Sequence, residues 1–183
     1  MHSLELIAIV LTLALVASIL WSTVRTGMPP MPSLGKGRKA MLDAVGEPQG
    51  GAIVDMGSGW GTLVIPLARR YPGVRVEGYE LSWFPWLASW LAARLLRLSN
   101  ARFHRRDFVQ ADLGQVDTVL CYLMPAGMEQ VRQRLETAPG GVRTLISHHF
   151  AVTGWEPVSV HRLRDLYQTP IYTYRIPDSL PVT

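Results

Sequence analysis

From residue 40 onward, short apolar runs alternate with longer segments of helical periodicity. The runs of strand length are residues 53–56, 74–80, 116–123 and 142–147, with a further strand-like run before Arg106. The helical segments are residues 38–45, 62–71, 83–98 and 124–137, and glycine or proline follows several of them. This alternation predicts an α/β fold with a largely parallel sheet. Only residues 150–154 separate the fifth run from Trp155, so residues 158–163 and 171–176 are expected to form a closing antiparallel hairpin.

Residues 6–24 form a run of 19 residues without a charge. As a helix this run measures about 28 Å, close to the hydrocarbon thickness of a bilayer, so it is a candidate transmembrane helix. A cleaved signal peptide is the alternative, although residues 1–5 lack the positive region that such a signal needs. The cations Arg25, Lys36, Arg38 and Lys39 follow the run and predict a single-pass membrane protein whose catalytic domain faces the cytoplasm.

These segments divide the chain into three parts. Residues 1–26 are expected to form the N-terminal membrane anchor, residues 27–37 a linker of proline and glycine, and residues 38–183 one globular domain. In the helical segment 83–98, Trp83, Trp86 and Trp90 recur at spacings of three and four, which predicts one shared face that packs in the core. The helix is apolar on most sides, so an outer face that touches lipid or a membrane-embedded substrate is the alternative.

A glycine-rich turn after the first apolar run indicates a ligand site. Gly57, Gly59 and Gly61 follow Asp55 at the end of the expected strand, so backbone N–H groups can approach a ligand closely. The spacing differs from the dinucleotide fingerprint, and the carboxylate of Asp55 would repel a phosphate. A carboxylate at this strand end suits the ammonium group of S-adenosylmethionine (SAM).

Two further carboxylates follow the next strands. Glu80 ends the second apolar run and can accept both hydroxyls of a ribose. Asp107 follows the third run and can accept from the adenine amino group, with Phe108 beside the ring. The ordered set of Asp55, the three glycines, Glu80 and Asp107 is far more specific than the glycine turn alone.

Charge and cysteine content narrow the classes of function. Most of the net charge of +4 arises in the first 39 residues, since residues 40–183 hold 14 Arg against 13 Asp and Glu. Binding to nucleic acid therefore has little support. The single cysteine, Cys121, excludes a disulfide framework, and no acidic or histidine cluster near the fourth strand predicts a metal site.

Residues 40–177 resemble the class I, or seven-β-strand, SAM-dependent methyltransferases, most specifically between Ile53 and Asp107. The resemblance implies a Rossmann-like doubly wound sheet with SAM as cofactor. It places the cofactor against Asp55, Gly57, Ser58, Gly59, Gly61, Glu80, Leu81, Asp107 and Phe108.

A narrower resemblance concerns the acceptor. Residues 78–81, 85–87 and 101–103, and Pro125 with Met128, are similar to the membrane-anchored lysine methyltransferases of mitochondria, the family that modifies the c subunit of ATP synthase. This resemblance implies methyl transfer to a lysine side chain of a membrane protein. Candidate catalytic residues are Tyr122, Met124 and Pro125 after the fourth strand and His148 after the fifth, where histidine could act as a base or orient the amine.

Alternatives remain for both the histidine and the function. His148 could instead be a buried, hydrogen-bonded core residue, and Tyr122 could likewise belong to the core. The methyl acceptor could be a lipid or a lipophilic small molecule, for which a membrane anchor would serve equally well. A non-catalytic SAM-binding scaffold is the third possibility, suggested by Trp60 beside the glycines and by the absence of a helix after the fifth strand.

Overall fold

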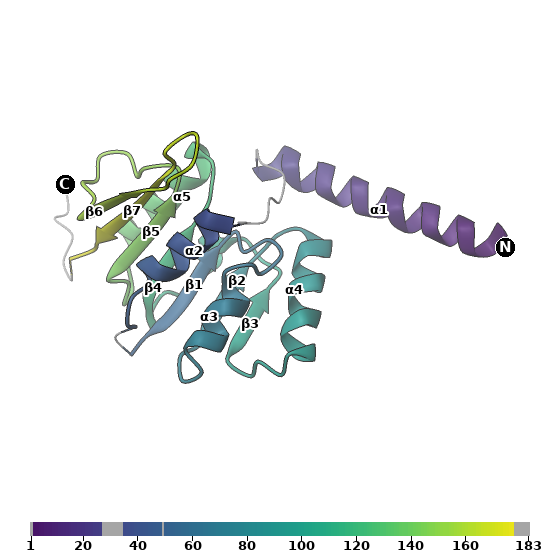
Figure 1. Ribbon diagram of the computed structural model, residues 1–183, viewed down its shortest axis with the longest axis horizontal. Coiled ribbons are helices and arrows are strands. Elements are labelled where there is room, and N and C mark those ends of the chain that lie inside the picture. Colours follow the sequence, from purple (N-terminus) through teal and green to yellow (C-terminus); the bar gives the residue numbers. More distant parts are fainter. Residues whose placement is uncertain (1, 27–34, 49, 178–183) are drawn as a thin grey trace.

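The computed structural model describes residues 2–26, 35–48 and 50–177. A seven-stranded sheet forms the centre of the domain, in the order β3-β2-β1-β4-β5-β7-β6, with β7 antiparallel to its neighbours (Figure 1). The strands are β1 Ala52–Met56, β2 Val76–Tyr79, β3 Ala101–His104, β4 Val116–Cys121, β5 Thr144–His148, β6 Ser159–Arg162 and β7 Pro170–Arg175. The helices are α1 His2–Thr26, α2 Gly35–Ala44, α3 Val64–Arg70, α4 Trp83–Leu95, α5 Pro125–Thr137 and the short 3₁₀ helix η1 Phe108–Gln110.

The predicted parallel sheet and the closing hairpin are both confirmed. Strands β1, β2, β3, β4 and β5 pair in parallel, and β6 with β7 forms the hairpin. Each parallel crossover carries a helix or short helical turn, which covers apolar strands on both faces. Strands β2 and β4 end before their apolar runs do, so that Glu80, Tyr122 and Leu123 leave the sheet at its carboxyl edge, where the candidate site lies.

Two buried clusters lie on opposite faces of the sheet. Helices α2, α3 and α4 pack on one face, where Met41, Leu67 and Ala93 contact the cluster that contains Leu120 and Ile146. Helix α5 packs on the other face, and its residues Met128, Val131 and Leu135 are buried there with every second residue of the strands. The period of two along each strand thus supplies both helix layers.

Helix α1 extends away from the domain (Figure 1) and contacts α4. Over the described residues, no helix combines the length with the apolar character that crossing a membrane requires. The prediction of a transmembrane helix at residues 6–24 is therefore not supported. Residues 27–34 of the predicted linker lie outside the described residues, and Gly35 to Gly37 already belong to α2.

The tryptophan stripe on α4 is only partly core. Trp83, Trp86 and Trp90 stack in sequence, with ring centroids 5.0 and 6.3 Å apart. Trp86 donates its indole N–H to the carbonyl of Phe103 at 3.1 Å, which joins α4 to β3. Trp83 at the start of the helix is 53% exposed. The predicted shared face therefore exists, but its first residue lies at the protein surface.

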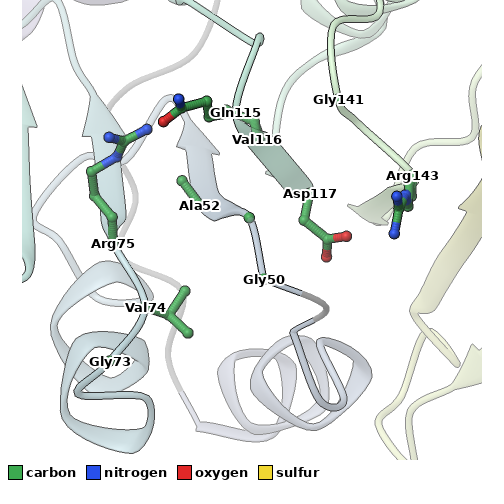
Figure 2. Close-up of a pocket in the computed structure, with 11 residues that line it drawn as sticks. Gly50, Ala52, Gly73, Val74, Arg75, Gln115, Val116, Asp117, Gly141 and Arg143 are labelled. Atoms are coloured by element: carbon green, nitrogen blue, oxygen red, sulfur yellow. The ribbon is translucent and has the colours of Figure 1, made fainter.

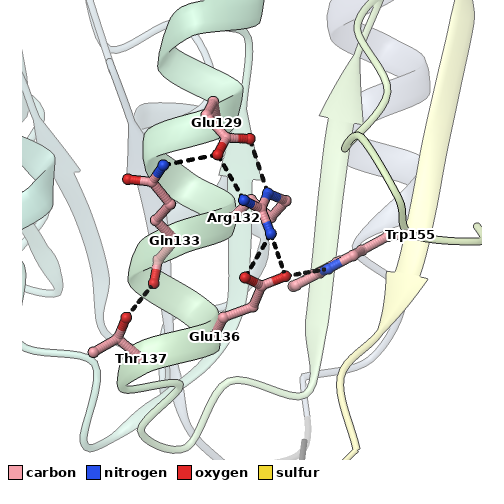
Figure 3. A network of polar contacts seen from close by, with 6 residues as sticks. All are labelled: Glu129, Arg132, Gln133, Glu136, Thr137 and Trp155. Atoms are coloured by element: carbon pink, nitrogen blue, oxygen red, sulfur yellow. Dashed lines mark hydrogen bonds and ion pairs between the residues drawn. The ribbon is translucent and has the colours of Figure 1, made fainter. Parts of the chain in front are cut away.

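The segment between β5 and β6 replaces the missing helix. Trp155 donates its indole N–H to Glu136 of α5 at 3.0 Å, and Glu136 also binds Arg132, which in turn binds Glu129 (Figure 3). The Trp155 ring also packs edge-on against Tyr174 of β7, at 6.1 Å between centroids. This segment covers the sheet through side-chain contacts, so the lack of a helix does not leave the fold incomplete.

We expect Trp155→Ala to lower the free energy of unfolding by about 2 kcal/mol, because a half-buried aromatic side chain is lost against the sheet. Urea unfolding monitored by circular dichroism measures this change. Trp155→Phe keeps most of the ring packing and should cost less than Trp155→Ala. Trp83→Ala is the matched control at a more exposed tryptophan, and a larger loss there would contradict the role given to Trp155.

Candidate functional site

The glycine turn leaves β1 with three left-handed residues. Gly57, Gly59 and Gly61 have φ values of +83°, +50° and +71°, which disfavour residues with a side chain. A Cβ at Gly57 would lie 2.8 Å from Leu123, and one at Gly61 would lie 2.9 Å from both Phe103 and Ser89. A Cβ at Gly59 would meet nothing within 4 Å. Gly57 and Gly61 therefore allow close packing of the protein itself, whereas Gly59 faces open space in which a ligand can lie.

Glu80 fixes this turn to the start of α4. Its Oε2 accepts a hydrogen bond from the Gly59 N–H at 2.9 Å, and its Oε1 accepts one from the Ser82 N–H at 2.6 Å. The residue is only 8% exposed. Because a carboxylate has about four acceptor positions, Glu80 retains capacity for ribose hydroxyls while it holds the turn.

Asp55 is buried at the end of β1 beside Glu80. Burial, and secondarily the charge of Glu80, raises the pKa of Asp55 to about 7. A buried carboxyl group with this pKa gains from a nearby cation, because the cation stabilises its charged form. This environment is compatible with the predicted contact between Asp55 and a positively charged ligand end, which stays a prediction.

We expect SAM affinity to rise as the pH increases toward about 7 and to level off above it. The raised pKa keeps a proton on Asp55 in the free protein, and a cationic ligand expels this proton, so binding releases a proton below that pH. Calorimetric titration between about pH 5 and about pH 7.5 measures the effect. Asp55→Asn should bind SAM more weakly, with no such rise. If Asp55→Asn showed the same rise of SAM affinity with pH, a group other than Asp55 would be responsible for it.

The remaining predicted cofactor residues lie around the same edge of the sheet. Asp107 caps η1 by accepting from the Val109 N–H at 3.1 Å, and Phe108 packs partly buried against the core. Leu81 follows Glu80 and is partly buried. Ser58 is buried, and its hydroxyl lies against Gly78, where a Cβ would be 2.6 Å away. Ser58 thus supports the sheet with its side chain and has only its backbone at the turn.

The predicted acceptor residues gather at the ends of β4 and β5. The rings of Tyr122 and His148 meet edge to face, with centroids 4.4 Å apart. Met124 precedes α5 and is 36% exposed, and Pro125 occupies the first turn of that helix. Of the four candidates, Tyr122 and His148 are therefore in contact, whereas Met124 and Pro125 form an exposed rim at the start of α5.

Strand register places these groups in one row. Leu120 of β4 pairs with Ile146 of β5, and both side chains belong to the cluster under α2 and α3. Tyr122 and His148 follow two residues later and therefore point to the same face. Because Met56 of β1 pairs with Cys121, Gly57 stands level with Tyr122. The glycine turn, Tyr122 and His148 thus occupy adjacent positions at the carboxyl edge, where open α/β sheets bind ligands.

A pocket of about 630 Å³ opens at the opposite, amino edge of the sheet (Figure 2). Arg75, Gln115, Asp117 and Arg143 contribute polar side chains to its lining. It is separate from the glycine turn, since Ala52 and Val116 begin β1 and β4 there. Within the described ranges, no group of three or more His, Cys, Asp and Glu side chains could hold a metal ion.

Two contacts of the site were not predicted from the sequence. Gly37 of α2 lies over His148, so that a Cβ there would be 2.9 Å from the imidazole Nε2. Leu123 packs against Gly57 from the end of β4. The four-residue spacing from Gly37 to the buried Met41 was the available signal for the first contact, because such residues share a helix face. No local pattern marked the second.

Comparison with known proteins agrees with this geometry. Residues 55–159 match the family described as the ANTKMT methyltransferase domain, which is more than half of the chain. The human lysine N-methyltransferase of the ATP synthase c subunit is 31% identical over 108 residues, which are 58% of this chain and 46% of that protein. A protein-lysine N-methyltransferase of Saccharolobus islandicus is 22% identical over 75% of this chain and 86% of its own length. The chain spans about half the length of the ATP synthase methyltransferases that it matches.

A solved structure supports the fold independently. An RNA methyltransferase from Salinibacter ruber, in complex with S-adenosyl-L-homocysteine, superposes with a TM-score of 0.71 over 82% of this chain and 97% of that one, at 24% identity. The predicted class I sheet, SAM as the cofactor and the resemblance to the lysine methyltransferases are thereby confirmed at the level of the family. The chain belongs to the ANTKMT methyltransferase domain family.

Proposed function

We propose that this protein transfers a methyl group from SAM to a lysine side chain of another protein. The observation that carries the proposal is the row at the carboxyl edge, where the glycine turn and its two carboxylates lie one strand from Tyr122 and two from His148. The names of two relatives, both protein-lysine methyltransferases, support lysine as the acceptor. We infer the acceptor from this combination.

The residues at the turn fit SAM by their chemistry. Gly59 faces open space, Glu80 holds acceptor capacity for a ribose, and Asp55 carries a carboxyl group that a cation would ionise. We expect Asp107 and Phe108 to contact the adenine ring. When bound, SAM supplies a sulfonium methyl group to which the neutral amine forms a C–N bond as the C–S bond breaks and a proton is lost to solvent.

The protein contributes mainly position and exclusion of water. The end of β4 offers the partly buried Tyr122 and Leu123, and a neutral amine is favoured over an ammonium where water is excluded. Holding the amine in line with the donor replaces a bimolecular encounter with a step inside one complex. The sulfonium already activates the methyl group, so positioning and desolvation account for the chemistry required here.

Methyl-labelled SAM tests the proposal directly. Membranes and soluble extract from a strain that lacks the protein are incubated with purified enzyme, and protein is then separated from lipid. We expect label in protein, recovered as methyl-lysine after hydrolysis, and no label with Gly59→Arg. Label confined to the lipid fraction would instead identify a lipophilic acceptor. SAM binding without transfer to either fraction would favour a scaffold.

We further propose that the enzyme works at the cytoplasmic face of a membrane. The support is the set of exposed apolar side chains on α1, namely Leu4, Leu6, Ile7, Ile9, Val10, Leu13, Val16 and Leu20. Eight exposed apolar side chains on one helix are typical of an interaction site. The cations of α2, Lys36, Arg38 and Lys39, favour the cytoplasmic leaflet because that leaflet carries anionic lipids.

Vesicle flotation tests this location. Vesicles of phosphatidylcholine with phosphatidylserine should carry the protein upward, and Ile9→Asp should reduce the bound fraction. Leu166→Asp is the matched control, because Leu166 is also an exposed apolar residue but lies far from α1 in sequence. Equal flotation of Ile9→Asp and Leu166→Asp would contradict membrane binding through α1.

A further inference from the structure

The imidazole of His148 is partly buried at the end of β5 with neither ring nitrogen hydrogen-bonded to any described residue. A neutral imidazole carries one donor and one acceptor, and leaving such groups buried without partners is destabilising. A phenyl ring at this position could pack against Tyr122 without that cost. The placement of a histidine here is therefore better explained by a ligand that supplies the missing partner.

The environment of His148 keeps the ring uncharged. Burial, and secondarily the neighbouring His149, lowers the pKa of His148 to about 4, although Asp165 acts in the opposite direction. At neutral pH the ring thus offers a lone pair to an N–H donor. It does not hold a proton taken from an amine, so it suits the role of an acceptor that orients the amine better than that of a base.

Helix α2 forms a cover over this ring. Met41, four residues after Gly37, is buried in the same cluster as Ile146, two residues before His148. The shared helix face thus follows β5, with Gly37 over the imidazole, where a Cβ would lie 2.9 Å from Nε2. Lys36 holds the start of α2 in place by donating to the carbonyl of Arg164 at 2.8 Å.

The distance to the glycine turn suits a methyl acceptor. His148 stands two strands from Gly57, and neighbouring strands lie about 4.8 Å apart, so the two backbones are about 10 Å apart. A donor against the turn and an amine beside the imidazole would therefore be neighbours along this edge of the sheet. Tyr122 lies between them on β4 and contacts the ring of His148.

We propose that His148 accepts a hydrogen bond from the acceptor amine and that Gly37, the residue of α2 that packs directly on the imidazole, sets the position of the ring for that contact. The inference rests on the proposed transfer to lysine and names the place where the lysine side chain ends. His148 is then a catalytic residue that directs the nitrogen lone pair toward the methyl donor. Gly37 is a positioning residue, because α2 packs on the imidazole at this glycine.

A binding measurement tests the site without any transfer. Protein labelled with ¹⁵N-histidine and saturated with S-adenosylhomocysteine is titrated with n-butylamine, which reproduces the end of a lysine side chain. We expect the ring-nitrogen signals of His148, assigned by their loss in His148→Phe, to shift before those of the exposed His161. Signals of His148 that do not move before those of His161 would overturn the proposal.

Rates of transfer give the second test, with label counted in protein and lipid together. His148→Phe should reduce the rate about 10- to 100-fold, the loss of one hydrogen bond to the reacting amine, while SAM affinity changes less than about 2-fold. His148→Gln retains an acceptor and should recover part of the rate. His161→Phe on β6 is the control and should be unaffected.

Gly37 is tested in the same assay. Gly37→Ala should raise KM for the acceptor, because a Cβ 2.9 Å from Nε2 forces the imidazole to move. Gly73→Ala is the matched control, since a Cβ at Gly73 meets nothing within 4 Å. An unchanged KM in Gly37→Ala would overturn the role of Gly37.

The two tests separate this inference from the proposed function. If wild-type protein labels only lipid and His148→Phe abolishes that label, the lysine acceptor is wrong and the acceptor site stands. If wild-type protein labels nothing, the proposed function fails, and the butylamine titration alone decides for or against the site. A full rate in His148→Phe would overturn the role of His148 whatever the acceptor.

Discussion

Gly59→Arg is expected to abolish SAM binding, with a loss of affinity greater than about 1000-fold. The φ of +50° at Gly59 costs a residue with a Cβ about 1–2 kcal/mol, which favours opening of the turn. The larger effect is steric, because the arginine side chain enters the open space that the ligand would occupy. Its positive charge also meets the cationic end of SAM beside Asp55. Calorimetric titration with SAM measures the loss.

Gly73→Arg is the control for this change. Gly73 lies in the turn after α3, has open space around its Cβ position and is distant from the carboxyl edge. Both variants should keep the far-ultraviolet circular dichroism of the wild type, since neither glycine is in a helix or strand. Normal SAM affinity in a folded Gly59→Arg protein would remove the glycine turn from the cofactor site.

The sheet was predictable because each local pattern agreed with the fold. The apolar run at residues 116–123 has the composition of a central parallel strand, and β4 is buried at all six of its residues. The hairpin followed from chain length alone, since the segment after β5 had no room for a helix. Local patterns could not show that Trp155 takes the place of the missing helix by binding Glu136 of α5. The two residues are 19 positions apart in the sequence.

The cofactor side of the site was more predictable than the acceptor side. Asp55 and Glu80 stand at fixed offsets from strands and glycines, so their place at the carboxyl edge follows from topology. The cover that α2 places over His148 depends on packing between residues 37 and 148, which no local pattern encodes. The exposed fraction of Trp83 likewise depended on its three-dimensional surroundings rather than on spacing.

The carboxylate of Glu80 holds the turn and, in the proposed cofactor site, would also bind the ribose. Glu80 accepts from the N–H groups of Gly59 and Ser82, so the carboxylate that is available to a ribose also fixes the conformation of the turn. Preorganisation of this kind reduces the entropy that ligand binding must overcome. It also means that removal of the carboxylate should affect affinity by two routes.

Glu80→Ala is therefore expected to weaken SAM binding more than about 100-fold. Hydrogen bonds to a charged group contribute about 1.5–3 kcal/mol each, and the variant loses both the acceptor for the ribose and the brace of the turn. Calorimetric titration provides the affinity. Glu77→Ala is the matched control, because Glu77 lies on the same strand but binds Arg75 and His104 outside the turn. Equal affinities in the two variants would exclude Glu80 from the cofactor site.

The pH dependence of Glu80→Ala adds a test that steric loss alone would not pass. The charge of Glu80 is one cause of the raised pKa of Asp55, after burial. Its removal should lower that pKa, because a like charge no longer opposes ionisation of the buried carboxyl group. The rise of SAM affinity with pH should then level off at a lower pH than in the wild type. An unchanged midpoint would mean that burial alone sets the pKa of Asp55 and that the two carboxylates act independently on the ligand.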